Sequence, residues 1–150
     1  MTTSELPDVR EQRPFGYWLR HIDGAIEQCM ARLFAADALS RRGWQVLNTV
    51  ACGPLTTAEV DETMAPFLTA DEPTMRPYLD ALAARGWVRI GEEAVVALTE
   101  DGRAAHLRIS TQVAALRERL TACVTPEEFA TLMTLLRRIG AHLDTLTEAA

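Results

Sequence analysis

The chain is 150 residues long, 48% of its residues are hydrophobic, and its formal net charge is −6. This hydrophobic content is typical of a globular protein and excludes a disordered one, and the length suits a single domain, residues 1–150, with one core. The acidic balance argues against a generally basic surface of the kind that coats nucleic acid. The sequence contains no run of about 18 uncharged apolar residues, so we expect no membrane-spanning segment and no membrane partner.

The first 13 residues mix acidic and basic side chains and contain no apolar run. This pattern argues against a secretory signal and predicts a frayed N-terminal tail on a cytoplasmic protein. In a reducing compartment the three cysteines, Cys29, Cys52 and Cys123, are expected to be free thiols that are buried as small hydrophobic side chains. All 15 basic residues are arginine, a bias typical of GC-rich bacterial genomes.

The first predicted element is a long helix over about residues 14–38. Pro14 suits the first turn of a helix, and the apolar side chains that follow recur at steps of three and four residues. They form one broad stripe that consists of Phe15, Trp18, Leu19, Ile22, Ala25, Ile26, Cys29, Met30, Leu33 and Phe34.

Three shorter helices are predicted next. Ser40 is a suitable N-cap for the first, and the Gly-Pro pair at 53–54 ends it. The second follows Thr56 or Thr57 and ends at Pro66, because proline interrupts a helix.

The third short helix is expected over about residues 74–85. Thr74 is the predicted N-cap, and Pro77 must then lie in the first turn, where a missing amide proton is tolerated. Gly86 closes the helix.

The hydrophobic pattern then changes period. Residues 87–90 and 94–98 are rich in β-branched side chains and flank the short segment 91–93, which predicts a tight two-stranded hairpin. Thr99 is the expected N-cap of a long helix over about residues 100–124.

A last helix is predicted from the segment that begins at Thr125. Thr125 is a suitable N-cap, Pro126 takes the first position, and Glu128 completes a capping box. The apolar side chains along this helix are Phe129, Leu132, Met133, Leu136, Ile139, Leu143 and Leu146.

Three short helices followed by a hairpin describe a winged helix-turn-helix. With one long helix before it and two after it, the arrangement resembles the MarR family of bacterial transcriptional regulators. Four segments carry the resemblance through their order and spacing: residues 39–47 (LSRRGWQVL), 55–60 (LTTAEV), 80–88 (DALAARGWV) and 98–103 (LTEDGR).

The resemblance spans about residues 15–146 and implies a mainly α fold with one short β-hairpin. It implies a homodimer whose long helices, about 14–38 and 100–147, interlock, and whose winged lobes, about 40–99, bind adjacent major grooves of double-stranded DNA. We therefore expect a DNA-binding transcriptional regulator. The residues expected to contact DNA are Thr56, Thr57, Thr74, Arg76, Tyr78 and Arg89; for Tyr78, a place in the core is an equal alternative.

Members of this family often bind a small aromatic or phenolic ligand between the dimer helices and the DNA-binding lobe, and we expect such a ligand to release the protein from DNA. Aromatic walls with a few polar groups suit ligands of this kind. The candidate ligand-binding residues are Trp18, His21, Trp44 and His106. The alternative is that these four residues belong to the core or to an interface.

Two features favour a second function, that of a dimeric adaptor that binds a ligand or a protein and has lost sequence-specific DNA binding. The segment 91–94 is short and acidic where the family's wing carries an arginine, and Pro77 stands where the recognition helix often has a polar residue. In addition, residues 40–103 contain six arginines and ten acidic residues, a net charge of −4. Phosphate contacts supply much of the affinity for DNA, so this lobe must concentrate its few arginines on one surface.

Enzyme chemistry finds little support in the sequence. His21, His106 and His142 form no metal-binding pattern with cysteines or acidic residues. The sequence contains no glycine-rich phosphate loop and no nucleophile motif. We expect neither an enzyme activity nor a metal or cofactor.

Overall fold

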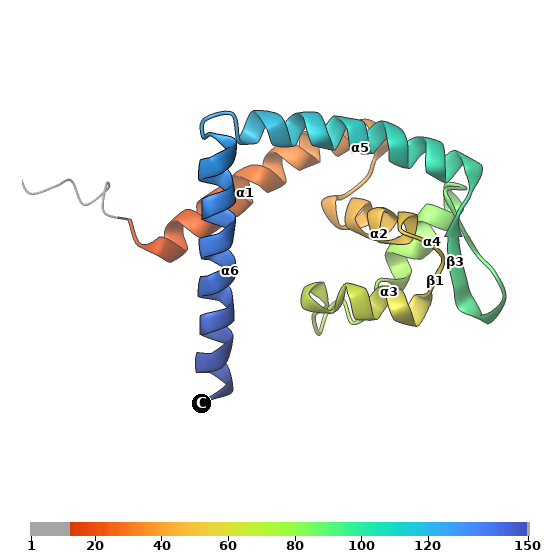
Figure 1. Cartoon of the computed structure of the whole chain (residues 1–150). Coiled ribbons are helices and arrows are strands. Elements are labelled where there is room, and N and C mark those ends of the chain that lie inside the picture. Colours follow the sequence, from red (N-terminus) through yellow and green to blue (C-terminus); the bar gives the residue numbers. More distant parts are fainter. Residues whose placement is uncertain (1–12, 150) are drawn as a thin grey trace, which may run out of the picture. The chain divides into compact units, whose positions relative to one another are not determined.

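The computed structural model describes residues 13–149, so the predicted N-terminal tail lies outside the described residues except for Arg13. Over these residues the chain is mainly helical, with six α-helices and one small antiparallel sheet (Figure 1), which confirms the predicted fold class. It divides into two compact units, one that ends at Ser110 and one that begins at Thr111. None of the described helices is long and apolar enough to cross a membrane.

Helix α1 (Phe15–Phe34) begins one residue after Pro14, which is its N-cap rather than a residue of its first turn. It ends before the predicted limit of about residue 38, and a short 3-10 helix, η1 (Ala35–Asp37), comes directly after it. The buried residues of α1 are Met30 and Phe34, both near its C-terminal end. The earlier part of the predicted apolar stripe is exposed on the single chain, in the side chains of Phe15, Trp18, Leu19 and Ile22. Most of this stripe therefore lies outside the core of the first unit.

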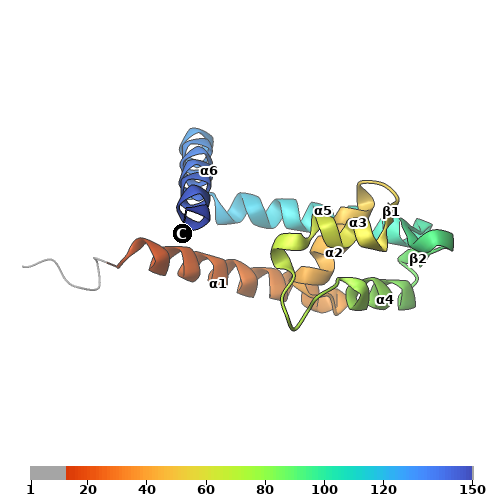
Figure 2. The ribbon, with the colours of Figure 1, turned by 90° about the horizontal axis from the view of Figure 1, so that it is seen from below.

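Helix α2 (Arg41–Ala51) begins as predicted at Ser40, whose Oγ accepts a hydrogen bond of 2.9 Å from the amide of Gly43. It packs against α1, the helices that follow, and the sheet, so it is the central element of the first unit (Figure 2). Its inward side chains include Val46 and Leu47, which are fully buried.

Thr56 is the N-cap of helix α3 (Thr57–Thr63), which decides between the two predicted starts. Thr56 and Glu59 form a capping box in which each side chain bonds the other residue's amide. The helix ends before Pro66, and a 3-10 helix, η2 (Ala65–Phe67), follows.

Helix α4 (Arg76–Ala84) begins later than predicted, because Met75 rather than Thr74 is its N-cap. The Thr74 side chain is nevertheless part of the helix start, since its Oγ1 accepts a hydrogen bond of 3.1 Å from the amide of Arg76. Pro77 lies in the first turn, as predicted, where an amide proton would have no partner within the helix.

The predicted hairpin is present as β2 (Val88–Ile90) and β3 (Val95–Leu98), which pair antiparallel. A third strand, β1 (Leu55–Thr56), was not predicted; it pairs with β3 and places β3 in the middle of the sheet. The connection includes Glu93 and Ala94, both with a φ of 57°. Such left-handed conformations match the right-handed twist of paired strands in a tight turn.

The core of the first unit is built from helices that surround α2. Its largest fully buried side chains come from α1, α2, α3, α4, β3 and α5, together with the N-cap of α4. They are Phe34, Leu47, Met75, Leu79, Leu82, Ile109, Val46, Val50, Val60 and Val96. The core therefore packs the short helices and the sheet into one lobe.

Helix α5 (Glu100–Leu120) starts in the first unit, and its start is bonded to the segment between α4 and β2. Thr99 Oγ1 accepts a hydrogen bond of 3.0 Å from the amide of Gly102, as expected of an N-cap, and donates one of 2.5 Å to the carbonyl of Gly86. The Thr99 amide donates to the carbonyl of Trp87 at 3.0 Å. Helix α5 ends at Leu120, four residues before the predicted end.

A salt bridge also ties α5 to the segment between α1 and α2. The guanidinium of Arg108 donates two hydrogen bonds, of 3.1 and 2.8 Å, to the carboxylate of Asp37. These bonds hold the pKa of Asp37 below its ordinary value, although partial burial acts in the opposite direction. The bidentate geometry fixes η1 against α5.

Helix α6 (Pro126–Glu148) belongs to the second unit and starts as predicted, with Thr125 as N-cap and a capping box with Glu128. None of its described residues is buried. Its exposed large apolar side chains are Phe129, Leu132, Leu135, Ile139, Leu143 and Leu146. The single chain leaves an apolar helix face without a partner.

We predict that Gly102→Ala destabilises the first unit. A Cβ at Gly102 would lie 1.9 Å from the carbonyl oxygen of Trp87, a backbone atom that cannot move without breaking its bond to Thr99. The melting temperature should fall by several degrees. The matched control is Gly24→Ala, in the middle of α1, where a Cβ meets nothing within 4 Å and should stabilise the helix by up to about 1 kcal/mol. An unchanged melting temperature for Gly102→Ala would contradict the packing described for this joint.

Candidate functional site

The start of α4 is held by a carboxylate from α3. Asp61 Oδ2 accepts a hydrogen bond of 2.8 Å from the Thr74 hydroxyl, and Asp61 Oδ1 accepts one of 2.7 Å from the amide of Met75. The first amides of a helix have no partner within it. A carboxylate at this place accepts a hydrogen bond from such an amide and interacts favourably with the positive end of the helix dipole. Asp61 therefore determines where α4 begins.

The two polar side chains in the first turn of α4 are both paired with acidic residues. Arg76 Nε donates a hydrogen bond of 2.8 Å to Asp80, one turn further along the helix, and both side chains are about half exposed. The Tyr78 hydroxyl donates one of 2.7 Å to Glu72. This bond and partial burial raise the pKa of Tyr78.

The outward face of α4 consists mostly of small side chains. Met75, Leu79 and Leu82 are buried, and the face opposite to them is exposed. Its exposed residues are Arg76, Pro77, Asp80, Ala81 and Ala84. A helix with such a face can approach another surface closely along its length.

The other predicted DNA-contacting residues lie on the same lobe. The Thr56 hydroxyl is used in the capping box, and Thr57 is half-buried at the first position of α3. Arg89 is exposed on β2, whereas Glu92 and Glu93 are exposed in the connection to β3. A role of these residues in DNA binding stays a prediction.

A cavity of about 400 Å³ opens between α1, the N-terminus of α2, η2 and α4. Asp23 and Glu27 line it from α1, and Phe67 and Tyr78 line it from η2 and α4. The start of α2 supplies the rest of the lining, with Ser40, Arg41, Arg42 and Gln45. The lining therefore combines two carboxylates, two guanidinium groups and two aromatic rings.

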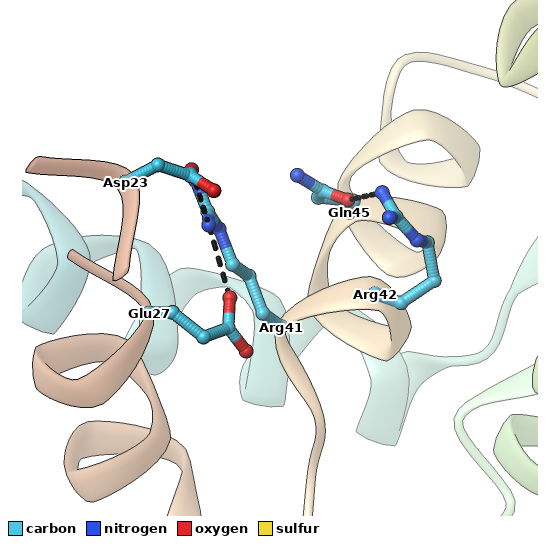
Figure 3. A network of polar contacts seen from close by, with 5 residues as sticks. All are labelled: Asp23, Glu27, Arg41, Arg42 and Gln45. Atoms are coloured by element: carbon cyan, nitrogen blue, oxygen red, sulfur yellow. Dashed lines mark hydrogen bonds and ion pairs between the residues drawn. The ribbon is translucent and has the colours of Figure 1, made fainter. Parts of the chain in front are cut away.

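One side of the cavity holds a triad of charges. Arg41 reaches from α2 toward α1, and its Nη1 donates to Glu27 at 2.9 Å and to Asp23 at 3.2 Å (Figure 3). Burial lowers the pKa of Arg41, but the two carboxylates more than offset this and raise it above its ordinary value. The Asp23 and Glu27 side chains are 74% and 53% exposed, so each carboxylate keeps an open side toward solvent.

The neighbouring arginine has a different environment. The Arg42 guanidinium lies over the Phe67 ring, 4.3 Å from its centroid. It also donates a hydrogen bond to Gln45 (Figure 3). Within the described part of the chain, Arg42 forms no ion pair with an acidic residue. Its positive charge is close enough to Tyr78 to lower the pKa of that hydroxyl, against the larger effect of Glu72.

The four residues predicted to bind a ligand form two separate aromatic contacts. Trp18 and His21 lie edge to face with ring centroids 6.0 Å apart, and Tyr17 contacts both rings. Trp44 and His106 stack at 5.3 Å, and the His106 Nε2 lies 2.9 Å from Asn48 Oδ1. None of the four lines the cavity described above, and their role in ligand binding stays a prediction.

Burial lowers the pKa of His106 and so favours its neutral imidazole. The three cysteines are free thiols, as expected, but the prediction that they are buried was wrong: Cys29 is half-buried, and Cys52 and Cys123 are exposed. The described residues contain no cluster of histidine, cysteine and acidic side chains with metal-binding geometry.

The acidic residues that hold the start of α4 and line the cavity were not predicted from the sequence. Asp61 counted only as one of ten acidic residues, because its partners are 13 and 14 residues away in the chain. Asp23 and Glu27 were not predicted to belong to a site; their spacing of four residues was the one available signal that they share a face.

Several solved structures are similar to this chain. A MarR mutant from E. coli complexed with operator DNA is 23% identical, covers 86% of this chain and 95% of its own, and has a TM-score of 0.70. Rv2887, a MarR family protein of Mycobacterium tuberculosis in complex with p-aminosalicylic acid, is 22% identical, with 85% and 99% coverage and a TM-score of 0.65.

BpsR of Bordetella bronchiseptica, whose DNA binding is regulated by 6-hydroxynicotinic acid, is 20% identical, with coverage of 85% of this chain and 95% of its own and a TM-score of 0.72. No protein-family model matches the chain, and no curated protein matches it significantly in sequence. The chain has the fold of the MarR-family regulators.

We predict that Asp61→Ala destabilises the start of α4 more than its charge alone would suggest. The substitution removes a charge-assisted bond to a helix amide, which is typically worth about 1.5–3 kcal/mol, and leaves the Met75 amide without its acceptor. The matched control is Glu62→Ala, which removes the same charge from an exposed neighbouring position. Chemical denaturation should show a loss for the first variant only. Equal effects of the two substitutions would contradict a positioning role for Asp61.

Proposed function

We propose that the chain is a MarR-type homodimeric transcriptional regulator whose binding to double-stranded DNA responds to a small ligand. One observation carries the proposal: a complete winged helix-turn-helix, with an exposed recognition helix α4 and a strand hairpin beside it, lies in a fold shared with a protein complexed with operator DNA. Ligand control is supported by neighbours of the same fold that bind or respond to aromatic acids.

The exposed face of α4 suits the major groove. Its alanines and Pro77 allow the helix backbone to come close to base edges, and Arg76 supplies a donor that suits guanine. The pairing of Arg76 with Asp80 does not prevent this, because an exposed ion pair of this kind contributes only about 0–1 kcal/mol. A phosphate or base edge can therefore take the place of the carboxylate.

The charge of the lobe makes DNA affinity modest. Residues 40–103 have a net charge of −4, and the connection between β2 and β3 presents Glu92 and Glu93. Each phosphate neutralised contributes about −0.9 to the slope of log affinity against log salt, so few contacts give a shallow slope. Binding then depends on the recognition helix and on two lobes acting together.

Homodimerisation accounts for the exposed apolar faces of α1 and α6. On each of these helices several large apolar side chains are about half exposed. A group of exposed apolar side chains of this kind marks an interaction surface. A second copy of the chain is the partner that the MarR fold suggests. Two such faces suit an obligate interface of more than about 2,000 Å².

The second candidate function is that of an adaptor that keeps the dimer and has lost specific DNA binding. The acidic connection between β2 and β3 favours it, because no cation stands at the position from which a wing enters the minor groove. The two candidates differ in one measurement, which is binding to promoter DNA at low salt.

For DNA binding, we predict that Asp80→Asn strengthens binding and that Arg76→Ala weakens it by about 1–3 kcal/mol per lobe, since Arg76 is freed in one variant and absent in the other. In the double variant the gain from Asp80→Asn should largely disappear, because it acts through Arg76. Fluorescence anisotropy on DNA from beside the chain's own gene measures all three. The matched control, Arg20→Ala, removes the same charge from the exposed side of α1.

Full affinity of Arg76→Ala would show that α4 is not the recognition helix. If no promoter fragment binds the wild type at about 50 mM salt, the adaptor function replaces the regulator.

For assembly, we predict that Leu143→Asp dissociates a dimer. Leu143 is 49% exposed on the single chain, so the substitution costs a monomer little, whereas it places a charge inside a paired apolar face. Sedimentation at micromolar concentration should detect the loss of the dimer. Thr145→Asp is the control, because it adds the same charge to an exposed position on another side of α6. A folded wild-type monomer under these conditions would refute the homodimer.

A further inference from the structure

We propose that the cavity between α1, the start of α2, η2 and α4 binds a small aromatic zwitterion, that is, a compound with one ammonium group, one carboxylate and one ring. The proposal names the effector class of the regulator and rests on the proposed function only for its effect on DNA binding. The distribution of charge around the cavity supports a ligand of this class.

The wall on α1 has an excess of negative charge. Asp23 and Glu27 share the single cation Arg41, and both bond the same nitrogen of that guanidinium. Three charged groups therefore leave a net charge of −1, and the open sides of both carboxylates face solvent. An ammonium group would complete this wall, because it supplies three donors in a compact charge.

The wall at Arg42 has the opposite excess. Arg42 is held by the face of the Phe67 ring and by Gln45, both of which are uncharged. A guanidinium carries five N–H donors, and Gln45 uses only a part of them. A carboxylate is the partner whose planar geometry matches the donors that remain.

Two aromatic rings in the lining indicate that the ligand also contains a ring. Phe67 and Tyr78 line the same cavity from η2 and α4, and the Phe67 side chain is partly exposed. A planar ring can pack against these side chains. A cavity of about 400 Å³ lies at the lower end of the usual range for ligand sites, which suits one ring with two short charged arms.

These requirements together select a ligand of zero net charge. A simple aromatic acid satisfies Arg42 but brings a second negative charge toward Asp23 and Glu27. A simple aromatic amine satisfies the carboxylates but leaves Arg42 without a counterion. Only a zwitterion pairs with both walls, since their net charges are −1 and +1.

The site also has a direct path to the recognition helix. Tyr78 is a residue of α4, and its hydroxyl is held by Glu72 in the segment before that helix. A ligand packed against Tyr78 contacts the helix that the proposed function assigns to the major groove. Occupancy should therefore shift the balance between DNA-bound and free protein.

The test uses the full chain and three probes of similar size: L-phenylalanine, phenethylamine, which lacks the carboxylate, and 3-phenylpropionate, which lacks the ammonium. Isothermal titration without DNA measures the dissociation constants. We expect L-phenylalanine to bind at least about tenfold more tightly than either singly charged probe.

Two variants assign the walls. Arg42→Gln should lower the affinity for L-phenylalanine to about that of phenethylamine, and Glu27→Gln should lower it by a similar factor while it favours 3-phenylpropionate. Arg32→Gln is the matched control, because it removes an exposed charge from α1 outside the cavity and should leave all three constants unchanged. Melting temperatures of the free variants separate a loss of binding from a loss of folding.

Three results would overturn the proposal: equal binding of 3-phenylpropionate and L-phenylalanine, retention of affinity in Arg42→Gln, or no heat from any probe at millimolar concentration. The DNA experiment is separate. Binding of L-phenylalanine by a protein that binds no promoter would leave this site standing and refute the regulator, whereas promoter binding that no probe affects would remove only the regulatory role of the cavity.

Discussion

The position of the outward face of α4 depends on where this helix begins, and the carboxylate of Asp61 sets the start of the helix. Asp61 binds the Thr74 hydroxyl and the Met75 amide, so a side chain joins α3 to the start of α4 in addition to the loop between them. Pro77 then fits the first turn without loss of a hydrogen bond. Because Met75 is fully buried beside this joint, its position also fixes the rotation of α4 and thereby its outward face.

The features that sequence predicted correctly are the ones that short-range chemistry determines. Ser40, Thr56 and Thr125 each cap a helix through an amide three residues ahead, so the pattern is visible within four residues of sequence. The exact start of α4 and the strand β1 were missed for the opposite reason. Asp61 acts on residues far along the chain, and β1 is defined only by its pairing with β3.

The candidate sites divide in the same way. The residues expected to contact DNA could be named because the order of elements resembles a winged helix-turn-helix. The sequence could not show that Arg76 and Tyr78 are paired with the acidic residues Asp80 and Glu72. The cavity could not be foreseen. Its walls come from α1, α2, η2 and α4, and the contact between Arg41 and Asp23 spans 18 residues, a distance over which no periodic pattern operates.

Tyr78 belongs both to α4, the proposed recognition helix, and to the lining of the cavity. Its hydroxyl is paired with Glu72 beside the start of α4, and its side chain lines the cavity that Asp23, Glu27 and Arg42 surround. Of the six arginines in this lobe, two have an acidic partner: Arg76 is paired with Asp80, and Arg41 with two carboxylates. A ligand or a phosphate must therefore replace one of these partners or use one of the other four arginines. The Tyr78 hydroxyl is held by Glu72 and lies within the electrostatic reach of Arg42. A ligand that pairs with Arg42, as proposed, would therefore change the field at the first turn of α4.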